Sequence, residues 1–463
     1  MTHTQDTHKH DLPTRTRAAA VHRRSWMALL AVGLLAIGVY VFVIKAGAVP
    51  ARAIWAIVAL TLSGVICRPW RVPEAVWAVL GATTLVGLGL LSWTAAWRAI
   101  GQGSDVYLFL TGMMLLAELA RREGLFDWLA AHAARHAHGS APRLFALVYG
   151  VGTIVTVFLS NDATAIVLTP AVYAVTKAAR VTPLPYLLVC AFVANAASFV
   201  LPISNPANLV IFGRTIPPLT AWLSQFALPS VLALGATYVT LRCTQASVLR
   251  QRVATDIVAP PLSHGGRLAA YGIGGTAVVL VLVSALDTPL GLPTCLAGCT
   301  TAAIVLLHKR ESPRYLVTGV SWSVLPLVAG LFVLVAGLEE VGVLRSLGQG
   351  LRAAAAHSTA GTAWGAGIML AGACNVMNNL PAGLLAGAIV HAAHVPSQVV
   401  GAVLIGLDLG PNLSVTGSLA TLLWLVALRR EGEDVGPWQF LRLGVVVMPP
   451  ALLLALGALV LLG

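Results

Sequence analysis

Charged residues are scarce in this sequence. Only 10% of its 463 residues are Asp, Glu, Lys or Arg, whereas 58% are hydrophobic and the mean hydropathy is +0.85. Soluble globular proteins carry about a quarter charged residues, so this shortage excludes a soluble domain and predicts an integral membrane protein with several spans. The net charge of +12 lies mainly in short loops between apolar runs, where cations orient a membrane protein. Nucleic-acid binding is therefore not expected.

Motifs of catalysis and of cofactor binding are also missing. The sequence has no His-Glu-x-x-His helix, no Gly-x-Ser-x-Gly elbow and no phosphate-cradling glycine loop, which disfavours an intramembrane enzyme and predicts no cofactor and no metal. Cys295 and Cys299 lie one helical turn apart, but in a span away from the polar segments described below, so we interpret them as small hydrophobes. The few cysteines lie mostly inside apolar runs and predict no disulfide framework: Cys67, Cys190, Cys243, Cys295, Cys299 and Cys374.

Small polar side chains interrupt an apolar stretch at residues 158–164, which read FLSNDAT. The apolar runs on either side, 144–159 and 163–176, are each shorter than the roughly 20 residues that a membrane-crossing helix needs. Lys and Arg flank both outer ends, as is typical of cytoplasmic loops. This pattern predicts a re-entrant helical hairpin that enters and leaves the bilayer on the cytoplasmic side.

A second interruption of the same kind occurs at residues 376–381, which read VMNNLP. Asn379 follows Asn161 by 218 residues, and the same shift places Gly330 on Gly112. We therefore expect an internal repeat with a second re-entrant hairpin.

Two longer apolar runs, 185–212 and 398–428, are broken in their middles at 201–206 (LPISNP) and at 410–418 (GPNLSVTGS). Proline removes a backbone donor and crowds the preceding turn, so each run should unwind there. Unwound backbone at membrane depth is tolerated only beside protein or a water-filled cavity. The break at 201–206 is therefore expected to face a cavity.

The cations and apolar runs together predict an all-α polytopic membrane protein of two inverted repeats, with about 11 spans and two hairpins. Each repeat crosses the membrane an odd number of times, so the N-terminus is expected in the cytoplasm and the C-terminus outside. Residues 124–138 and 341–356 should lie at the membrane surface, 315–338 should form one span, and Arg98 should lie in a loop between spans. The expected divisions are a polar tail (1–25), an additional first span (26–52), the first repeat (53–241), a cytoplasmic linker (242–267) and the second repeat (268–463).

The His-rich tail is interpreted as a disordered cytoplasmic segment, with metal sensing as the alternative.

Inverted repeats with broken helices and paired hairpins are the plan of secondary transporters, which hold substrate near the membrane midplane. A channel is disfavoured for the same reason. The candidate substrate-binding side chains are Ser160, Asn161, Thr164, Asn195, Ser204, Asn205, Asn208, Asn378, Asn379, Asn412, Thr416 and Ser418. Such residues also cap helix ends and satisfy unwound backbone, and we expect both roles.

Carboxylates inside the membrane are rare and usually functional. Asp162 at the first hairpin and Asp408 at the second break are the candidate proton-coupling residues, with Asp408 favoured. The alternative is that each carboxylate caps a helix end. Glu118 lies beside Arg121 and Arg122 and is expected to form a surface ion pair.

Four motifs resemble the arsenical pump membrane subunit family, a branch of the ion transporter superfamily. They are FLSNDAT at 158–164, SNPAN at 204–208, NNLP at 378–381, and LDLGPN at 407–412 followed by TGSLATLLW at 416–424. The resemblance runs from about Trp26 to the C-terminus. It implies export of arsenite and antimonite across the inner (plasma) membrane in exchange for protons, in some members with a soluble ATPase. The alternative is a sodium- or proton-coupled di- or tricarboxylate carrier, or a sodium/proton transporter, of the same superfamily.

The residue chemistry of the polar segments agrees with an uncharged substrate. Trivalent arsenic at neutral pH is a neutral trihydroxide, which needs hydrogen-bond partners and no fixed cation. A dicarboxylate would favour a cationic clamp or bound sodium at helix N-termini. Neither hairpin tip contains Lys or Arg, which favours arsenite. A homodimer, an ATPase partner, and rocking or elevator motion are left open.

Overall fold

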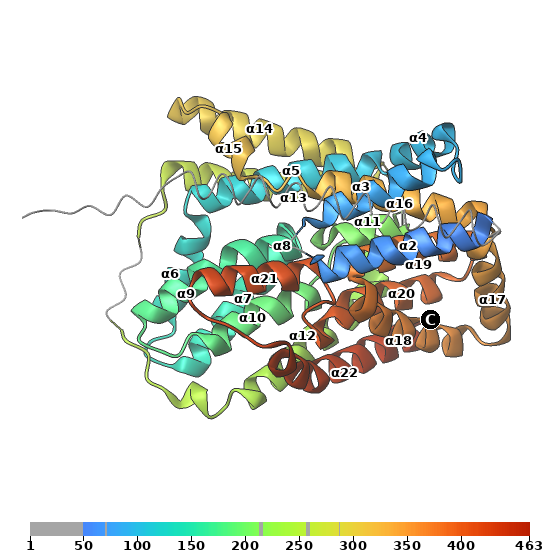
Figure 1. Cartoon of the computed structure of the whole chain (residues 1–463). Helices are drawn as coiled ribbons and strands as arrows, with labels where there is room; N and C mark the ends of the chain where they lie inside the picture. The colour runs from blue at the N-terminus through green and yellow to red at the C-terminus, as the bar shows by residue number, and fades with distance from the viewer. Residues whose placement is uncertain (1–49, 70–71, 213–215, 256–259, 287) are drawn as a thin grey trace, which may run out of the picture.

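The computed structural model describes residues 50–69, 72–212, 216–255, 260–286 and 288–463. Over these ranges the chain is helical, and the only β-type pairing in them is an isolated bridge between Ser140 and Arg252 (Figure 1). The all-α fold expected from the sequence is thereby confirmed. The polar tail and the additional first span up to residue 49 lie outside the described residues and stay predictions.

The first half contains the first expected hairpin and the first broken helix. The hairpin consists of α7, a sharp turn at Leu159–Ser160, and a return arm that begins with a π-helical turn. The bounds are α2 (Pro50–Cys67), α3 (Glu74–Gly87), α4 (Trp93–Gln102), α5 (Ser104–Arg122), α6 (Leu125–His136), α7 (Ala141–Phe158), α8 (Asn161–Ala163), the π-turn η2 (Thr164–Leu168), α9 (Thr169–Ala178), α10 (Leu184–Ala196), the 3-10 turn η3 (Pro202–Ser204), α11 (Pro206–Phe212), α12 (Leu219–Thr244) and η4 (Val248–Arg250).

The second half follows from His264, and its order of elements is similar. Its helices are α13 (His264–Ala285), α14 (Gly291–Lys309), α15 (Arg314–Gly319), α16 (Val324–Glu340), α17 (Val343–His357), α18 (Thr359–Met377), α19 (Asn379–Ala393), α20 (Ser397–Leu409), the 3-10 turn η5 (Gly410–Leu413), α21 (Leu419–Arg430) and α22 (Pro437–Leu462).

Corresponding helices of the two halves keep constant sequence separations. Helix α20 begins and ends 213 residues after α10, and α18 begins 218 residues after α7. Helices α6 and α17 follow Gly124 and Gly342, 218 residues apart, and both glycines adopt a left-handed conformation, with φ of 73° and 74°. A left-handed residue is easiest for glycine, so the same turn chemistry sets the start of both helices.

Glycine also permits the closest helix contacts between the halves. Helix α5 packs on α14 and α16 packs on α3. A Cβ added at Gly112 in α5 would collide with the Thr294 carbonyl oxygen, and one at Gly330 in α16 would lie 2.6 Å from the Ala78 carbonyl carbon. The two glycines are 218 residues apart, so equivalent positions of the two halves make equivalent close contacts.

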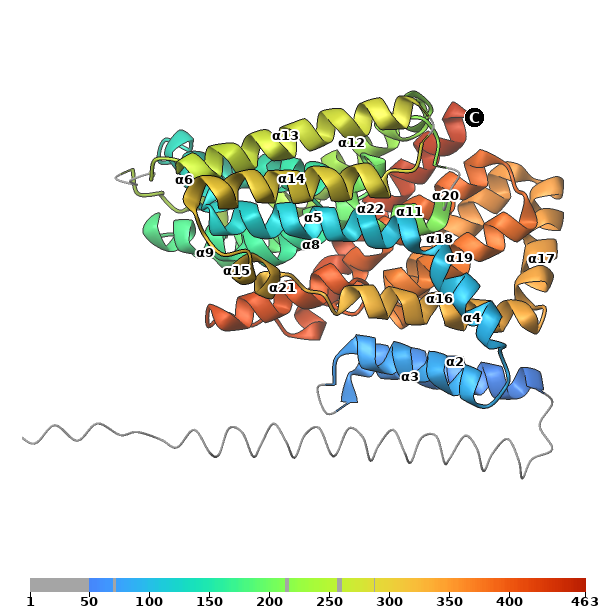
Figure 2. The ribbon, with the colours of Figure 1, turned by 90° about the horizontal axis from the view of Figure 1, so that it is seen from above.

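The long helices run roughly along one direction of the molecule, with α6 and α17 at its opposite ends (Figures 1 and 2). Helices α13 and α14 form the outer layer on one side beyond α5, and α2 and α3 lie on the other side beyond α16 (Figure 2). The hairpins and broken helices lie between these layers. The polar interruptions are therefore placed inside the bundle.

By length and composition, five described helices can cross a membrane, or up to seven if each sharply bent helix pair is one span. The five are α7, α12, α13, α14 and α22. Helix α7 has 18 residues and passes this test, although its run was expected to be too short to cross. A multi-pass membrane protein is thus confirmed, while the expected total of about 11 spans stays a prediction.

Two local expectations were wrong. Residues 315–338 do not form one span, because the chain unwinds between α15 and α16, where the Trp322 indole N–H donates to the Val317 carbonyl oxygen (2.7 Å). The loop expected around residue 98 is the helix α4, capped by the Ser92 hydroxyl, which accepts from Ala95 N at 3.2 Å. Trp93 on α4 is 65% exposed, as suits a helix at a membrane interface.

Candidate functional site

The first hairpin tip is held by local caps. The Ser160 hydroxyl accepts from Ala163 N (3.2 Å), and the Asn161 side-chain oxygen accepts from Asp162 N (2.9 Å). Thr164 is fully buried and its hydroxyl lies 2.8 Å from that of Thr156 in α7, so it ties the two arms of the hairpin together. The structure therefore gives Ser160 and Thr164 structural partners within the hairpin.

The second hairpin tip is bonded to the second break. Asn378 has φ of 70°, and its side-chain amide donates to the Thr416 carbonyl oxygen at 3.4 Å. The backbone N of Asn379 donates to the Gly417 carbonyl oxygen at 2.9 Å. The second hairpin tip and the second break are therefore in direct contact.

The two broken helices are joined to each other across the halves. The Asn205 amide donates to Asp408 Oδ1 at 2.7 Å, and the Asn195 amide donates to Asn412 Oδ1 at 3.0 Å and to Thr421 Oγ1 at 3.3 Å. All of these side chains are buried. The centre of the protein is thus a polar contact between elements more than 200 residues apart in sequence.

Asp408 is completely buried, and only one of its carboxylate oxygens is satisfied. Its Oδ2 has no hydrogen-bond partner among the described residues. A buried, unpartnered carboxylate oxygen is costly when charged, because nothing replaces the water it has lost. The position fits a carboxyl group that takes up and releases a proton.

The remaining candidates mainly satisfy unwound backbone. Ser204 Oγ donates to the Val157 carbonyl oxygen (3.1 Å), and the Asn208 amide donates to the Ser198 carbonyl oxygen (2.8 Å). Thr416 Oγ1 donates to the Asn375 carbonyl oxygen at 2.9 Å, and Ser418 caps α21.

Two of the candidates keep free amide groups. Within the described part of the chain, the side-chain N–H groups of Asn161 and the whole side-chain amide of Asn379 have no protein partner. These residues are equivalent under the 218-residue shift, one at each hairpin tip. Both are buried and neither lines a cavity described below, but their amides are the ones among the candidates that the protein leaves available for hydrogen bonds.

Sequence reasoning missed Asn375, one turn before the second tip. Its amide donates to the carbonyl oxygens of Ala371 (2.7 Å) and Gly410 (3.0 Å), and its Oδ1 accepts from Ser414 Oγ at 2.7 Å. It therefore fixes η5 and the following loop against α18. A polar amide inside an otherwise apolar hairpin arm was the signal that could have identified it.

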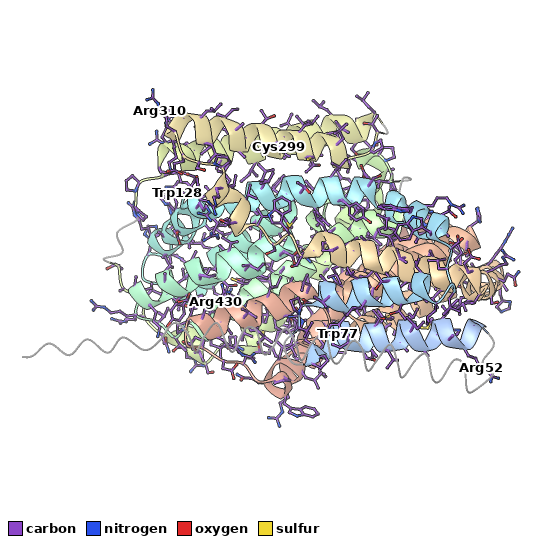
Figure 3. All side chains as sticks on the ribbon, turned by 45° about the horizontal axis from the view of Figure 1, so that its top comes forward. Arg52, Trp77, Trp128, Cys299, Arg310 and Arg430 are labelled. Atoms are coloured by element: carbon purple, nitrogen blue, oxygen red, sulfur yellow. The ribbon has the colours of Figure 1, made fainter. Side chains whose placement is uncertain are left out.

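A cavity of about 580 Å³ leads to the first hairpin tip. Ser160, Asp162 and Ala163 form its inner part, and apolar side chains of α5, η2 and α9 line its walls. Charged residues of α5, α6 and the end of α21 form its rim. Arg430 at this rim lies at the same end of the molecule as Trp128 in α6 (Figure 3).

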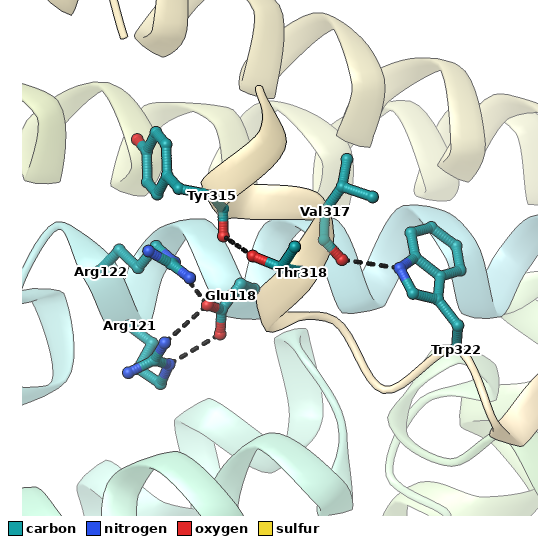
Figure 4. A network of polar contacts seen from close by, with 7 residues as sticks. All are labelled: Glu118, Arg121, Arg122, Tyr315, Val317, Thr318 and Trp322. Atoms are coloured by element: carbon teal, nitrogen blue, oxygen red, sulfur yellow. Dashed lines mark hydrogen bonds and ion pairs between the residues drawn. The ribbon is translucent and has the colours of Figure 1, made fainter. Parts of the chain in front are cut away.

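Ion pairs organise part of that rim. Glu118 accepts from Arg121 Nε (2.7 Å) and from Arg122 Nε (2.6 Å), and the Arg122 guanidinium lies over the Tyr315 ring (Figure 4). The expected Glu118 ion pair is present, but Glu118 itself is buried rather than on the surface. Burial raises the pKa of the Asp127 carboxyl on α6, and the charge of Arg121 opposes that rise.

A second cavity, of about 500 Å³, lies toward the opposite end, between α5, α11, α16, α17 and α19. Its polar lining includes Glu339, Arg345 and His391, and none of the candidate site residues lines it. At this end α19 packs closely on α11, where a Cβ on Gly387 would lie 2.8 Å from the Val210 carbonyl oxygen. Of these two cavities, the one on the α6 side reaches a hairpin tip and the other does not.

No cluster of three or more His, Cys, Asp or Glu side chains that could hold a metal ion occurs among the described residues. Cys295 and Cys299 lie on α14 in the outer layer, where Cys299 is exposed (Figure 3). The two cysteines therefore lie in a different layer of the bundle from the hairpin tips, as the sequence indicated.

The protein is a helical membrane bundle with a buried polar centre and a cavity that leads to its first hairpin tip. This arrangement is typical of transporters, and comparisons with known proteins agree. The chain belongs to the citrate transporter family, whose model matches residues 53–409. It is 27% identical to an arsenical pump membrane protein of Escherichia coli over 425 residues, covering 88% of this chain and 97% of the relative. The relative of the same name from Yersinia enterocolitica is 27% identical, covering 79% and 87%.

A solved structure, that of the Alcanivorax borkumensis YdaH transporter, has a TM-score of 0.48 and 15% identity, covering 80% of this chain and 87% of that one. The resemblance to arsenical pump membrane subunits is confirmed by the curated relatives. The protein is accordingly a membrane transporter and not an enzyme.

Proposed function

We propose that this protein exports arsenite and antimonite from the cytoplasm in exchange for protons. The observation that carries the proposal is the pair of free amides at the hairpin tips, Asn161 and Asn379, in a centre built from neutral amides and hydroxyls. Neutral donors and acceptors suit an uncharged trihydroxide. The names of the curated relatives support the same substrate class.

Proton coupling is assigned to Asp408 first and to Asp162 second. Asp408 joins the two broken helices through Asn205 and keeps one oxygen without a partner, so its charge would bear directly on the contact between the halves. A proton taken up there neutralises a buried carboxylate. Loading and unloading of that proton would therefore favour different arrangements of the polar centre.

The proposed architecture is two inverted repeats, 53–241 and 268–463, joined by the linker 242–267. The constant separations between helix bounds and the equivalent close contacts at Gly112 and Gly330 support this division. The arginine-rich α6 end is assigned to the cytoplasm of an inner (plasma) membrane, with the N-terminus inside and the C-terminus outside. A soluble ATPase partner and a homodimer are compatible with this arrangement.

The decisive test is transport by everted membrane vesicles energised with a proton gradient. Arsenite should accumulate without sodium, and collapse of the proton gradient should stop it. Citrate and succinate, with and without sodium, are assayed in parallel as matched substrates of the alternative class. Sodium-dependent carboxylate uptake with no arsenite signal would replace the proposed function by an organic-anion carrier.

The free amides provide a residue-level prediction. Asn161→Ala and Asn379→Ala should each raise the KM for arsenite roughly tenfold, because a hydrogen bond to an amide contributes about 1 kcal/mol and its loss leaves a solute group unpaired. Initial rates of vesicle uptake over a range of arsenite concentrations measure this. Gln245→Ala, which removes a half-buried amide outside the site, is the control. Unchanged KM in both tip variants would remove these residues from the binding site.

A further inference from the structure

Asp162 is the charged residue that the first hairpin tip contributes to the cavity on the α6 side. It lies at the inner end beside Ser160, half-buried, on the first turn of the hairpin's return arm. Among the described residues, no cation pairs with its carboxylate and no hydrogen bond reaches either carboxylate oxygen. Its charge is therefore uncompensated at the place where a solute would meet the hairpin tip.

The walls between the rim and Asp162 are apolar. Phe109, Leu110 and Met113 of α5 face Ile166 and Val167 of the return arm across the cavity. Few protein dipoles are available there to screen a charge, so a carboxylate acts on a solute over a longer range than it would in water. A cavity with low-dielectric walls also concentrates the field of the charges that line it.

The charged groups at the cavity rim do not make the cavity attractive to anions. Arg121 is bound to Glu118, and Arg430 stands next to Glu431. Counting all charged lining residues gives two cations, Arg121 and Arg430, against four carboxylates, at Glu118, Asp127, Asp162 and Glu431. The cavity lining is thus formally negative by two charges, or by one when Arg122, which binds Glu118 from outside the lining, is included, in a protein whose net charge is +12.

We propose that Asp162 is the specificity-determining residue of this cavity: its carboxylate admits uncharged polyhydroxylated solutes and rejects anions such as arsenate, phosphate and the carboxylates. This deepens the proposed function, since it explains how a member of a citrate transporter family would select a neutral substrate. Asn161 beside it supplies hydrogen bonds, and Asp162 supplies the charge filter. The two functions are carried by neighbouring residues and are separable by mutation.

The test measures charge selectivity without transport. A reporter thiol is introduced by Ile166→Cys, four residues after Asp162 on the cavity wall. The full-length protein is treated, at mildly alkaline pH where aspartate is ionised, with anionic sulfonatoethyl, cationic trimethylammonioethyl and uncharged methyl methanethiosulfonates. Peptide mass spectrometry gives the rate at residue 166 separately from the native thiols. The comparison is repeated with Asp162→Asn and, as an equal change of charge outside the cavity, with Asp434→Asn, whose partner is the exposed Arg429.

The ratio of the anionic to the uncharged rate should rise about tenfold or more with Asp162→Asn and stay constant with Asp434→Asn. An equal ratio with and without the Asp162 carboxylate would overturn the proposal. If Asp162→Asn does not fold, the order of rates at residue 166 in the otherwise unchanged chain decides: cationic before uncharged before anionic supports the filter, and an anionic rate as fast as the uncharged one refutes it.

The outcome is independent of the proposed substrate, because the reagents report access and not export. A charge filter in a protein that moves no arsenite would refute the export proposal alone. In vesicles that do accumulate arsenite, arsenate and citrate should inhibit uptake at least tenfold more strongly after Asp162→Asn than before it. Equal inhibition in the two would count against the filter.

Discussion

Asp408→Asn should abolish proton-driven accumulation of arsenite while leaving the protein folded. Asparagine has the same shape and its side-chain oxygen can still accept from Asn205, so the contact between the broken helices is retained. What is lost is the ability to bind and release a proton at the oxygen that has no partner. The steady-state level in energised everted vesicles should fall to that of vesicles without a proton gradient.

Downhill arsenite movement separates coupling from folding in this variant. The protein should still elute as a single species in detergent and still equilibrate arsenite down its own gradient. Asn205→Ala is the complementary variant, because it keeps the titratable group and removes its partner. A full proton-driven gradient in Asp408→Asn vesicles would transfer the coupling assignment to another group, and Asp162 would be the next to test.

Gly112→Leu should destabilise the helix bundle. Even a Cβ at Gly112 collides with the Thr294 backbone, and backbone cannot rotate away as a side chain can. Overpacking in a tight interface costs about 1–3 kcal/mol, and more where the main chain must move. Because helices in a bilayer associate largely through close packing of small residues, separation of α5 from α14 should lower the thermal stability by several degrees or abolish expression.

A matched glycine makes this prediction specific. A Cβ added at Gly274 in α13 would meet no other atom within 4 Å, so Gly274→Leu should express and unfold like the unchanged protein. Gly330→Leu, at the equivalent contact between α16 and α3, should resemble Gly112→Leu. Fluorescence-detected size exclusion after heating measures all three. Equal stability of the Gly112 and Gly274 variants would mean that the close helix contact is not required.

Much of the fold could be predicted from patterns local in sequence. Apolar length, flanking cations and paired prolines placed the hairpin at 158–164 and the break at 201–206, because backbone hydrogen bonding in a membrane depends mainly on neighbouring residues. The 218-residue shift anticipated that Gly124 and Gly342 would start equivalent helices. The same local reasoning missed α4, because a search for apolar runs long enough to cross the membrane passes over a helix of 10 residues, although this helix is strongly amphipathic and exposes two tryptophans.

The candidate site was predicted only as a set of residues. Sequence spacing could not show that Asn205 meets Asp408, or that Asn195 meets Asn412, since these pairs form between separate helices. It also could not tell an amide engaged with backbone, such as that of Asn208, from the free amide of Asn379. The distinction depends on which acceptors lie within about 3 Å, and a sequence does not contain that distance.

The sequence by itself determined that this protein is a helical membrane transporter with two polar interruptions per half, because composition, periodicity and helix-breaking residues act over a few turns of chain. The tertiary structure alone decided that Asp408 is sealed with one oxygen unpartnered, while Asp162 faces an open cavity. Both are carboxylates in polar segments between apolar runs, so their local sequences do not separate them. Their surroundings come from helices hundreds of residues away, and burial and pairing, not residue type, set what each carboxylate can do.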